Sequence, residues 1–218
     1  MTKTVETNPE KLRKDREYRE FSFEIRAAPL GADGGDGEGE ALYVEGYAVR
    51  FNETTVLWEY DNIQYKEKVA ATALAEADMS DVIFNYNHGG KVMARTRNKT
   101  LELKVDSKGL FIRARLDGTE EGRKLYEEIK GGYIDRMSYA YTTKETSYDS
   151  ESRTRTVLRI KKVYDVSAVD IPAYDTTSIS ARSAFEMEIE KEQQVAVATE
   201  AAAAAERRRK LLLKTLTY

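Results

Sequence analysis

Short runs in which apolar and polar residues alternate recur between residues 19 and 171 and predict a strand-rich protein. In the first such run, Phe21, Phe23 and Ile25 alternate with polar neighbours, so a strand is expected over 19–27. Similar patterns predict strands over 41–51, 56–69 with interrupting turns, 82–86, 137–143 and 156–171, the last being one bent strand or two. The runs 100–106 and 110–117 flank Ser107-Lys108-Gly109 and predict a hairpin.

Helical patterns are few. A short helix is expected over Thr72–Asp78, and a clearer one begins near Asp117, where Asp117 and Glu120 have the spacing of a capping box. Gly131-Gly132 marks its end. We therefore expect an α+β fold in which mostly antiparallel strands close into a β-barrel, with a few helices around it.

Changes in composition divide the chain into three parts. Residues 1–18 are almost without apolar side chains and indicate a flexible arm, and residues 19–183 form one domain. Residues 184–218 are rich in Glu, Gln, Ala, Arg and Leu and predict a helical tail. The glycine-rich segment 31–40 has no lysine and no following helix start, so it is interpreted as a connection rather than a phosphate-binding loop.

Charge and hydropathy limit the classes of partner that the protein is expected to bind. The 218 residues carry a net charge of −3, without the basic surplus typical of nucleic-acid binders. No apolar run reaches membrane-spanning length, and the N-terminus lacks the pattern of a signal peptide. We therefore expect a soluble protein that binds neither nucleic acid nor membrane. The absence of cysteine is typical of a protein of a reducing compartment.

The chemistry available to the chain is limited because His88 is its only histidine and cysteine is absent. A cysteine nucleophile and a Cys/His zinc site are both excluded, and any imidazole base must be His88. This residue follows the apolar run 82–86 just before a pair of glycines, where a strand end meets a loop. A lone histidine is also compatible with a purely structural role.

Two further polar residues interrupt apolar strands. Alternation along 137–143 sends Met137, Tyr139 and Tyr141 to the core and leaves Ser138 on the other, open face. An ordinary strand serine is the plainer interpretation. Asp165 lies in a largely apolar strand and needs a partner there, which is either a structural arginine or His88.

Several short segments occur in an order that resembles a known family. They are 45–48 with 51–52, 84–89, 92–96, 108–110, 122–125, 137–139, 165–169, 172–174 and 178–182. Over about residues 19–183 the chain resembles the prohead (capsid maturation) serine proteases of tailed bacteriophages, which are distantly similar in fold to the herpesvirus assemblin proteases.

This resemblance implies a serine endopeptidase without cofactor or metal, in which Ser138 is the nucleophile, His88 the base and Asp165 the acid that orients His88. Asp135 and Asp170 are the next candidates for the acid. The chain departs from the family pattern at Asp165, where a glutamate is expected, and at Ala140, where a glycine is common. The second histidine of the assemblins is absent.

The resemblance also implies a substrate and a place of action. The enzyme would cut the scaffolding segment of the major capsid protein precursor, and itself, inside the procapsid in the host cytoplasm. Self-association is left open, because the dimerisation of the herpesvirus relatives is not carried over by the resemblance. The tail 184–218 would hold the protease in the procapsid or be trimmed by self-cleavage. The alternative is a non-catalytic internal scaffold or capsid-associated protein. An esterase is disfavoured because the Gly-x-Ser-x-Gly elbow is missing.

Overall fold

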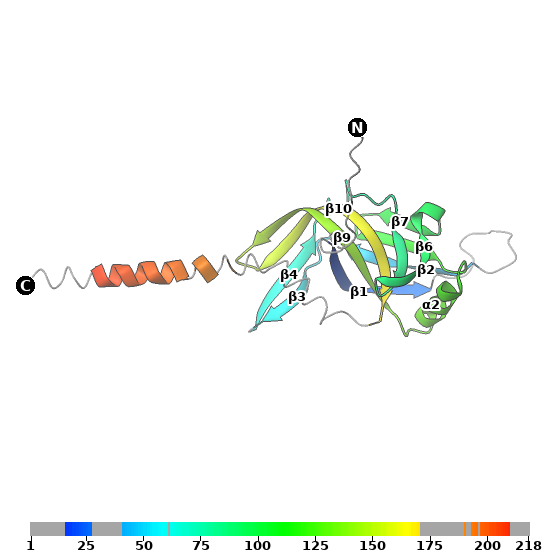
Figure 1. The fold of residues 1–218 in the computed structure, drawn as a ribbon, viewed down its shortest axis with the longest axis horizontal. Helices are drawn as coiled ribbons and strands as arrows, with labels where there is room; N and C mark the ends of the chain where they lie inside the picture. The colour runs from blue at the N-terminus through cyan, green and yellow to red at the C-terminus, as the bar shows by residue number, and fades with distance from the viewer. Residues whose placement is uncertain are drawn as a thin grey trace, which may run out of the picture.

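The structure is a computed structural model that describes residues 16–27, 41–60, 62–170, 190, 193–195 and 197–209 (Figure 1). Residues 1–15 of the expected arm 1–18 and the connection 31–40 lie outside the described residues, as does part of the tail. The elements are β1 (Glu17–Ala27), β2 (Tyr43–Arg50), β3 (Thr55–Tyr60), β4 (Ile63–Val69), β5 (Ile83–Tyr86), β6 (Gly89–Arg95), η1 (Thr96–Asn98), β7 (Leu101–Val105), β8 (Gly109–Arg115), α2 (Glu120–Lys130), β9 (Arg136–Asp149) and β10 (Thr154–Val169).

The two longest strands, β9 and β10, run side by side through the middle of the body (Figure 1). The sheet has the order β3-β4-β10-β9-β1-β2-β8-β7, and β5 joins it through β10 and carries β6. Within the described residues no pairing joins β3 to β7, so the expected closed barrel is not formed. The α+β class with mainly antiparallel pairing is as predicted, but the sheet is open at both ends of this order.

Strand β10 explains two parallel pairings that the local patterns did not predict. One edge of its 16 residues pairs with β9 along almost its whole length. The other edge is shared, because β4 pairs in parallel with residues 154–157 and β5 pairs in parallel with residues 165–168. The predicted stretch 156–171 is therefore a single long strand, and it brings distant parts of the chain together.

Helix α2 packs against β1, β2 and β6. Its N-cap is Thr119, whose side chain accepts a hydrogen bond from the Gly122 N–H, so the cap predicted at Asp117 is wrong by two residues. The short helix predicted over 72–78 is also wrong. That segment forms successive tight turns in which Ala73, Ala75 and Ala77 each donate to the third residue before, since so short a segment gains little from an α-helical nucleus.

The core lies beneath β9 and β10. Met137, Tyr139 and Tyr141 are buried there, as the alternation predicted, and the rings of Tyr139 and Tyr141 stack with centroids 4.7 Å apart. Residues 190, 193–195 and 197–209 of the tail are helical, in keeping with the composition (orange to red in Figure 1). No helix in the described part of the chain is long and apolar enough to cross a bilayer.

Candidate active site

His88 lies in the turn of the hairpin between β5 and β6. Tyr86 pairs with Gly89, so Asn87 and His88 form a two-residue loop, with φ of 48° and 54°. Two positive φ values are typical of a type I′ turn, which matches the twist of its strands. The turn was expected at the glycine pair, but Gly89 and Gly90 begin β6. The tight loop holds the His88 backbone in one orientation.

The side chains of His88, Ser138 and Asp165 meet although they come from three parts of the chain. The distance from His88 Nε2 to Ser138 Oγ is 2.6 Å, and that from His88 Nδ1 to Asp165 Oδ1 is 2.5 Å. Both ring nitrogens are therefore engaged, one by a hydroxyl and the other by a carboxyl group. A serine, an imidazole base and an acid joined in this order can carry out nucleophilic acyl transfer.

Strand register explains why these groups meet. Ser167 on β10 pairs with Ser138 on one side and, in parallel, with Asn85 on the other. The three polar residues form one row across β5, β10 and β9, and His88 reaches this row from the end of β5. Asp165 lies two residues before Ser167 on the same face of β10. It pairs with Ala140, whose small side chain leaves room beside it.

The row is buried. Ser138 has 0 % of its surface exposed, and Asn85 and Ser167 are buried with it. The expectation that Ser138 faces an open side is therefore wrong. Neighbouring strands β1 and β10 flank Ser138 on both sides, and His88 contacts its hydroxyl.

The two other candidate acids are engaged elsewhere. Asp170 accepts hydrogen bonds from the Tyr86 hydroxyl (2.6 Å) and from Asn87 Nδ2 (3.0 Å), and it thereby ties the hairpin turn to the end of β10. This hydrogen bond raises the pKa of Tyr86. Asp135 is largely exposed and lies 3.6 Å from Arg136 Nε. Of the three acids, Asp165 is the one at hydrogen-bond distance from His88.

Sequence reasoning missed Asn85 and Ser167. The Ser167 hydroxyl lies 2.9 Å from Asp165 Oδ1 and 3.2 Å from His88 Nδ1, and it also contacts the side-chain amide of Asn85. Both residues are polar positions within apolar strands, which is the signal that singled out Asp165. Applied evenly along 82–86 and 163–169, that criterion would have found them.

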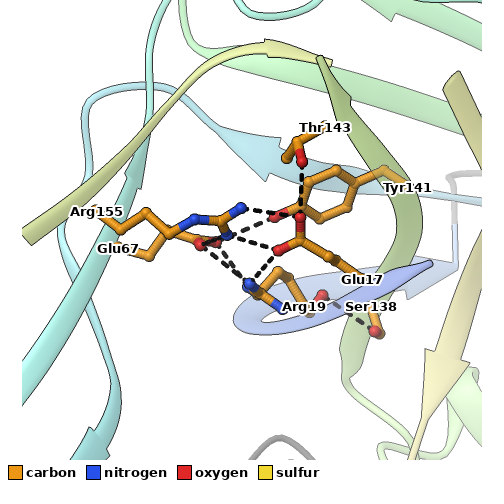
Figure 2. A network of polar contacts seen from close by, with 7 residues as sticks. All are labelled: Glu17, Arg19, Glu67, Ser138, Tyr141, Thr143 and Arg155. Atoms are coloured by element: carbon orange, nitrogen blue, oxygen red, sulfur yellow. Dashed lines mark hydrogen bonds and ion pairs between the residues drawn. The ribbon is translucent and has the colours of Figure 1, made fainter. Parts of the chain in front are cut away.

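A buried ion cluster lies next to Ser138 (Figure 2). Arg19 donates to Glu67 Oε1 (2.7 Å) and to Glu17 Oε2 (2.6 Å), and Arg155 Nη1 donates to the same two carboxylates at 2.5 and 2.6 Å. Tyr141 and Thr143 add hydroxyl donors. The main-chain oxygen of Arg19 lies 3.0 Å from Ser138 Oγ. The cluster therefore ties β1 to β4, β9 and β10.

Charge pairing in the cluster overcomes the cost of burial. Burial by itself would raise the pKa of Glu17, but the hydrogen bond from Arg155 and the charges of Arg19 and Arg155 lower it. Burial opposes the charged form of Arg19 too, yet Glu67 and Glu17 raise its pKa well above the ordinary value. Strand β1 begins at Glu17, two residues before the predicted start, because Glu17 is held by these arginines.

A metal centre has no candidate here: within the described residues, no group of three or more His, Asp or Glu side chains is arranged to hold an ion.

Comparisons with known proteins come from three directions. The family model described as caudovirus prohead serine protease matches residues 29–193. Among curated proteins, none matches the chain. Among solved structures, the capsid assembly protease gp21 of bacteriophage T4 is similar, with 15% identity and a TM-score of 0.42, over 72% of this chain and 99% of that one.

Proposed function

The chain belongs to the caudovirus prohead serine protease family, and from this premise we propose that it is a serine endopeptidase whose catalytic residues are Ser138, His88 and Asp165. The observation that carries the proposal is the pair of contacts on His88, 2.6 Å to Ser138 Oγ and 2.5 Å to Asp165 Oδ1.

The proposed reaction begins when Ser138 Oγ attacks a peptide carbonyl while His88 Nε2 takes the hydroxyl proton. Asp165 accepts the Nδ1–H bond, which selects the tautomer with a free Nε2 and stabilises the imidazolium that forms. His88 then gives the proton to the departing amine, leaving an acyl-serine. A water molecule, deprotonated by the same nitrogen, hydrolyses this ester and restores Ser138.

The proposed substrate is the scaffolding segment of the major capsid protein precursor, cut inside the procapsid in the host cytoplasm. The chain itself is the second proposed substrate, and its copies self-associate there. The catalytic domain would cover residues 19–183 together with Glu17 and Tyr18, which belong to β1, and an N-terminal arm would precede it. The tail 184–218 would hold the enzyme to the scaffold or be removed by self-cleavage.

The test is co-expression of the chain with its cognate capsid precursor, read by intact mass spectrometry. Wild type should shorten the precursor and itself, and Ser138→Ala should leave both intact. Ser147→Ala is the matched control, since Ser147 is exposed on the same strand β9, and it should cleave like wild type. Uncut masses with wild type, in capsids that still assemble, would favour a non-catalytic scaffold instead.

A further inference from the structure

Ser167 makes contacts that the proposed reaction does not require. Its hydroxyl lies 2.9 Å from Asp165 Oδ1 and 3.2 Å from His88 Nδ1, and it touches the side-chain amide of Asn85. Both Ser167 and Asn85 are buried, at 0 % and 4 % exposure. Buried hydroxyl and amide groups stay paired because an unpaired one is costly. The pairing must therefore obey a strict count of hydrogens.

The Ser167 hydroxyl has one hydrogen and two neighbouring oxygens, Asp165 Oδ1 and Asn85 Oδ1. If the hydrogen points to Asn85 Oδ1, Ser167 Oγ and the carboxylate oxygen Asp165 Oδ1 face each other at 2.9 Å with no hydrogen between them. If the Asn85 amide is turned by 180°, its NH₂ group faces Ser167 instead. Asn85 then donates to Ser167, and Ser167 donates to Asp165, so both contacts of the Ser167 hydroxyl pair a hydrogen with an acceptor.

We propose that Asn85 and Ser167 form a directed hydrogen-bond chain ending on Asp165, and that Ser167 is a positioning residue for the catalytic set. The effect of Ser167 on catalysis rests on the proposed function, whereas the hydrogen-bond distances of Ser167 do not depend on it. The row Asn85–Ser167–Ser138 places the hydroxyl where it meets the same carboxylate oxygen as His88 Nδ1.

The hydrogen-bond chain of Asn85 and Ser167 limits how strongly Asp165 stabilises a proton on His88. A buried carboxylate 2.5 Å from the ring stabilises the imidazolium, which cannot act as a base. A hydroxyl that donates to the same oxygen spreads the negative charge and weakens this hold. Asn85 strengthens the effect by polarising the Ser167 hydroxyl.

The test compares Ser167→Ala, Asn85→Ala and the double variant by two measurements. The first is the rate of capsid-precursor cleavage as a function of pH. Ser167→Ala should lose about 10-fold at neutral pH, with the acidic limb moved to higher pH and activity recovered above it. Asn85→Ala should show a smaller change of the same sign. The double variant should match Ser167→Ala, because Asn85 acts through Ser167.

The second measurement needs no substrate. His88 is the only histidine, so its ring signals in NMR are unambiguous, and Ser138→Ala provides a background in which the proposed self-cleavage cannot occur. Adding Ser167→Ala should move the titration midpoint of the ring to higher pH, and adding Asn85→Ala should do so by less. Thr142→Val is the control. The Thr142 hydroxyl, on β9, is buried like that of Ser167 but has no hydrogen-bond partner within the described part of the chain, so the titration midpoint of His88 should stay unchanged.

An unchanged or lowered midpoint in Ser167→Ala would overturn the inference, as would Asn85→Ala and Ser167→Ala effects that simply add. Should Ser167→Ala fail to fold, Asn85→Ala in the Ser138→Ala background decides by the same titration. Cleavage that survives Ser138→Ala alone would instead refute the proposed function, and the titration would still decide on the hydrogen-bond chain.

Discussion

Ser138 and Arg19 are in contact through the Arg19 main chain: Ser138 Oγ lies 3.0 Å from the Arg19 carbonyl oxygen. The same hydroxyl lies 2.6 Å from His88 Nε2. The Arg19 guanidinium meanwhile belongs to the buried ion cluster with Glu67 (Figure 2). The strand that flanks the candidate nucleophile is therefore anchored by charges that take no part in the proposed reaction, and the cluster is coupled to the site through Arg19.

Glu67→Gln should destabilise the fold strongly. Glu67 is fully buried and accepts from both Arg19 and Arg155, so its removal leaves buried cations short of a counter-charge. A loss of about 3–5 kcal/mol in the free energy of unfolding is expected. Urea denaturation in the Ser138→Ala background measures it. Glu76→Gln, which breaks the exposed pair with Lys144, should leave the urea midpoint unchanged.

Replacing both partners should cost less than replacing one. Arg19→Met together with Glu67→Leu removes the opposite charges at once, and apolar groups of similar size often substitute for a buried ion pair with little loss. The double variant should unfold at higher urea concentration than Glu67→Gln. If it unfolds at lower concentration, packing rather than charge balance holds this part of β1.

The cluster also predicts how stability depends on pH. The pKa of Glu17 is lowered below its ordinary value of 4.5, because the arginines outweigh the opposing effect of burial. A carboxyl group with a lowered folded-state pKa stabilises the fold above its ordinary pKa and loses that contribution as the pH falls. Unfolding free energy should therefore decline below about pH 4.5. Glu17→Gln should reduce the steepness of this decline, and equal slopes in both proteins would contradict the assignment.

Asp165→Asn and Asp170→Asn should separate the orienting acid from the acid that ties the hairpin. Asn at 165 would present an amide to His88 and favour the wrong tautomer, so a fall of about 10³- to 10⁴-fold in kcat is expected. Asp170 contacts Tyr86 and Asn87, and Asp170→Asn should retain most of the activity. Single-turnover cleavage of the capsid precursor provides the comparison. The reverse order of effects would move the acid to Asp170.

Asn87→Ala and Asn87→Gly should differ because of the backbone. Asn87 has a φ of 48° and is exposed, and Ala in that region costs about 1–2 kcal/mol whereas Gly does not. Both variants lose the bond to Asp170, so their difference isolates the turn. Thermal unfolding should show Asn87→Gly as the more stable. Equal stability would mean that the loop relaxes without the left-handed geometry.

Local sequence patterns were sufficient where neighbours along the chain decide the structure. The alternation of Met137, Tyr139 and Tyr141 predicted their burial, and Ser107-Lys108-Gly109 predicted the hairpin of β7 and β8. The side chains of His88, Ser138 and Asp165, which the family resemblance singled out, meet in space. In a chain with one histidine, the choice of base was restricted from the outset.

The open sheet, the parallel pairing of β10 with β4 and β5, and the row of Asn85, Ser167 and Ser138 depend on contacts between distant segments. Periodicity shows which face of a strand is apolar, but it does not show which strand lies beside it or in what register. The residue types of the chain therefore determined that its only imidazole base could be His88. Only the tertiary structure decided that Ser138, Asp165 and Ser167 would surround His88. The Arg19 carbonyl contacts Ser138 for the same reason, because pairing across the sheet sets those distances.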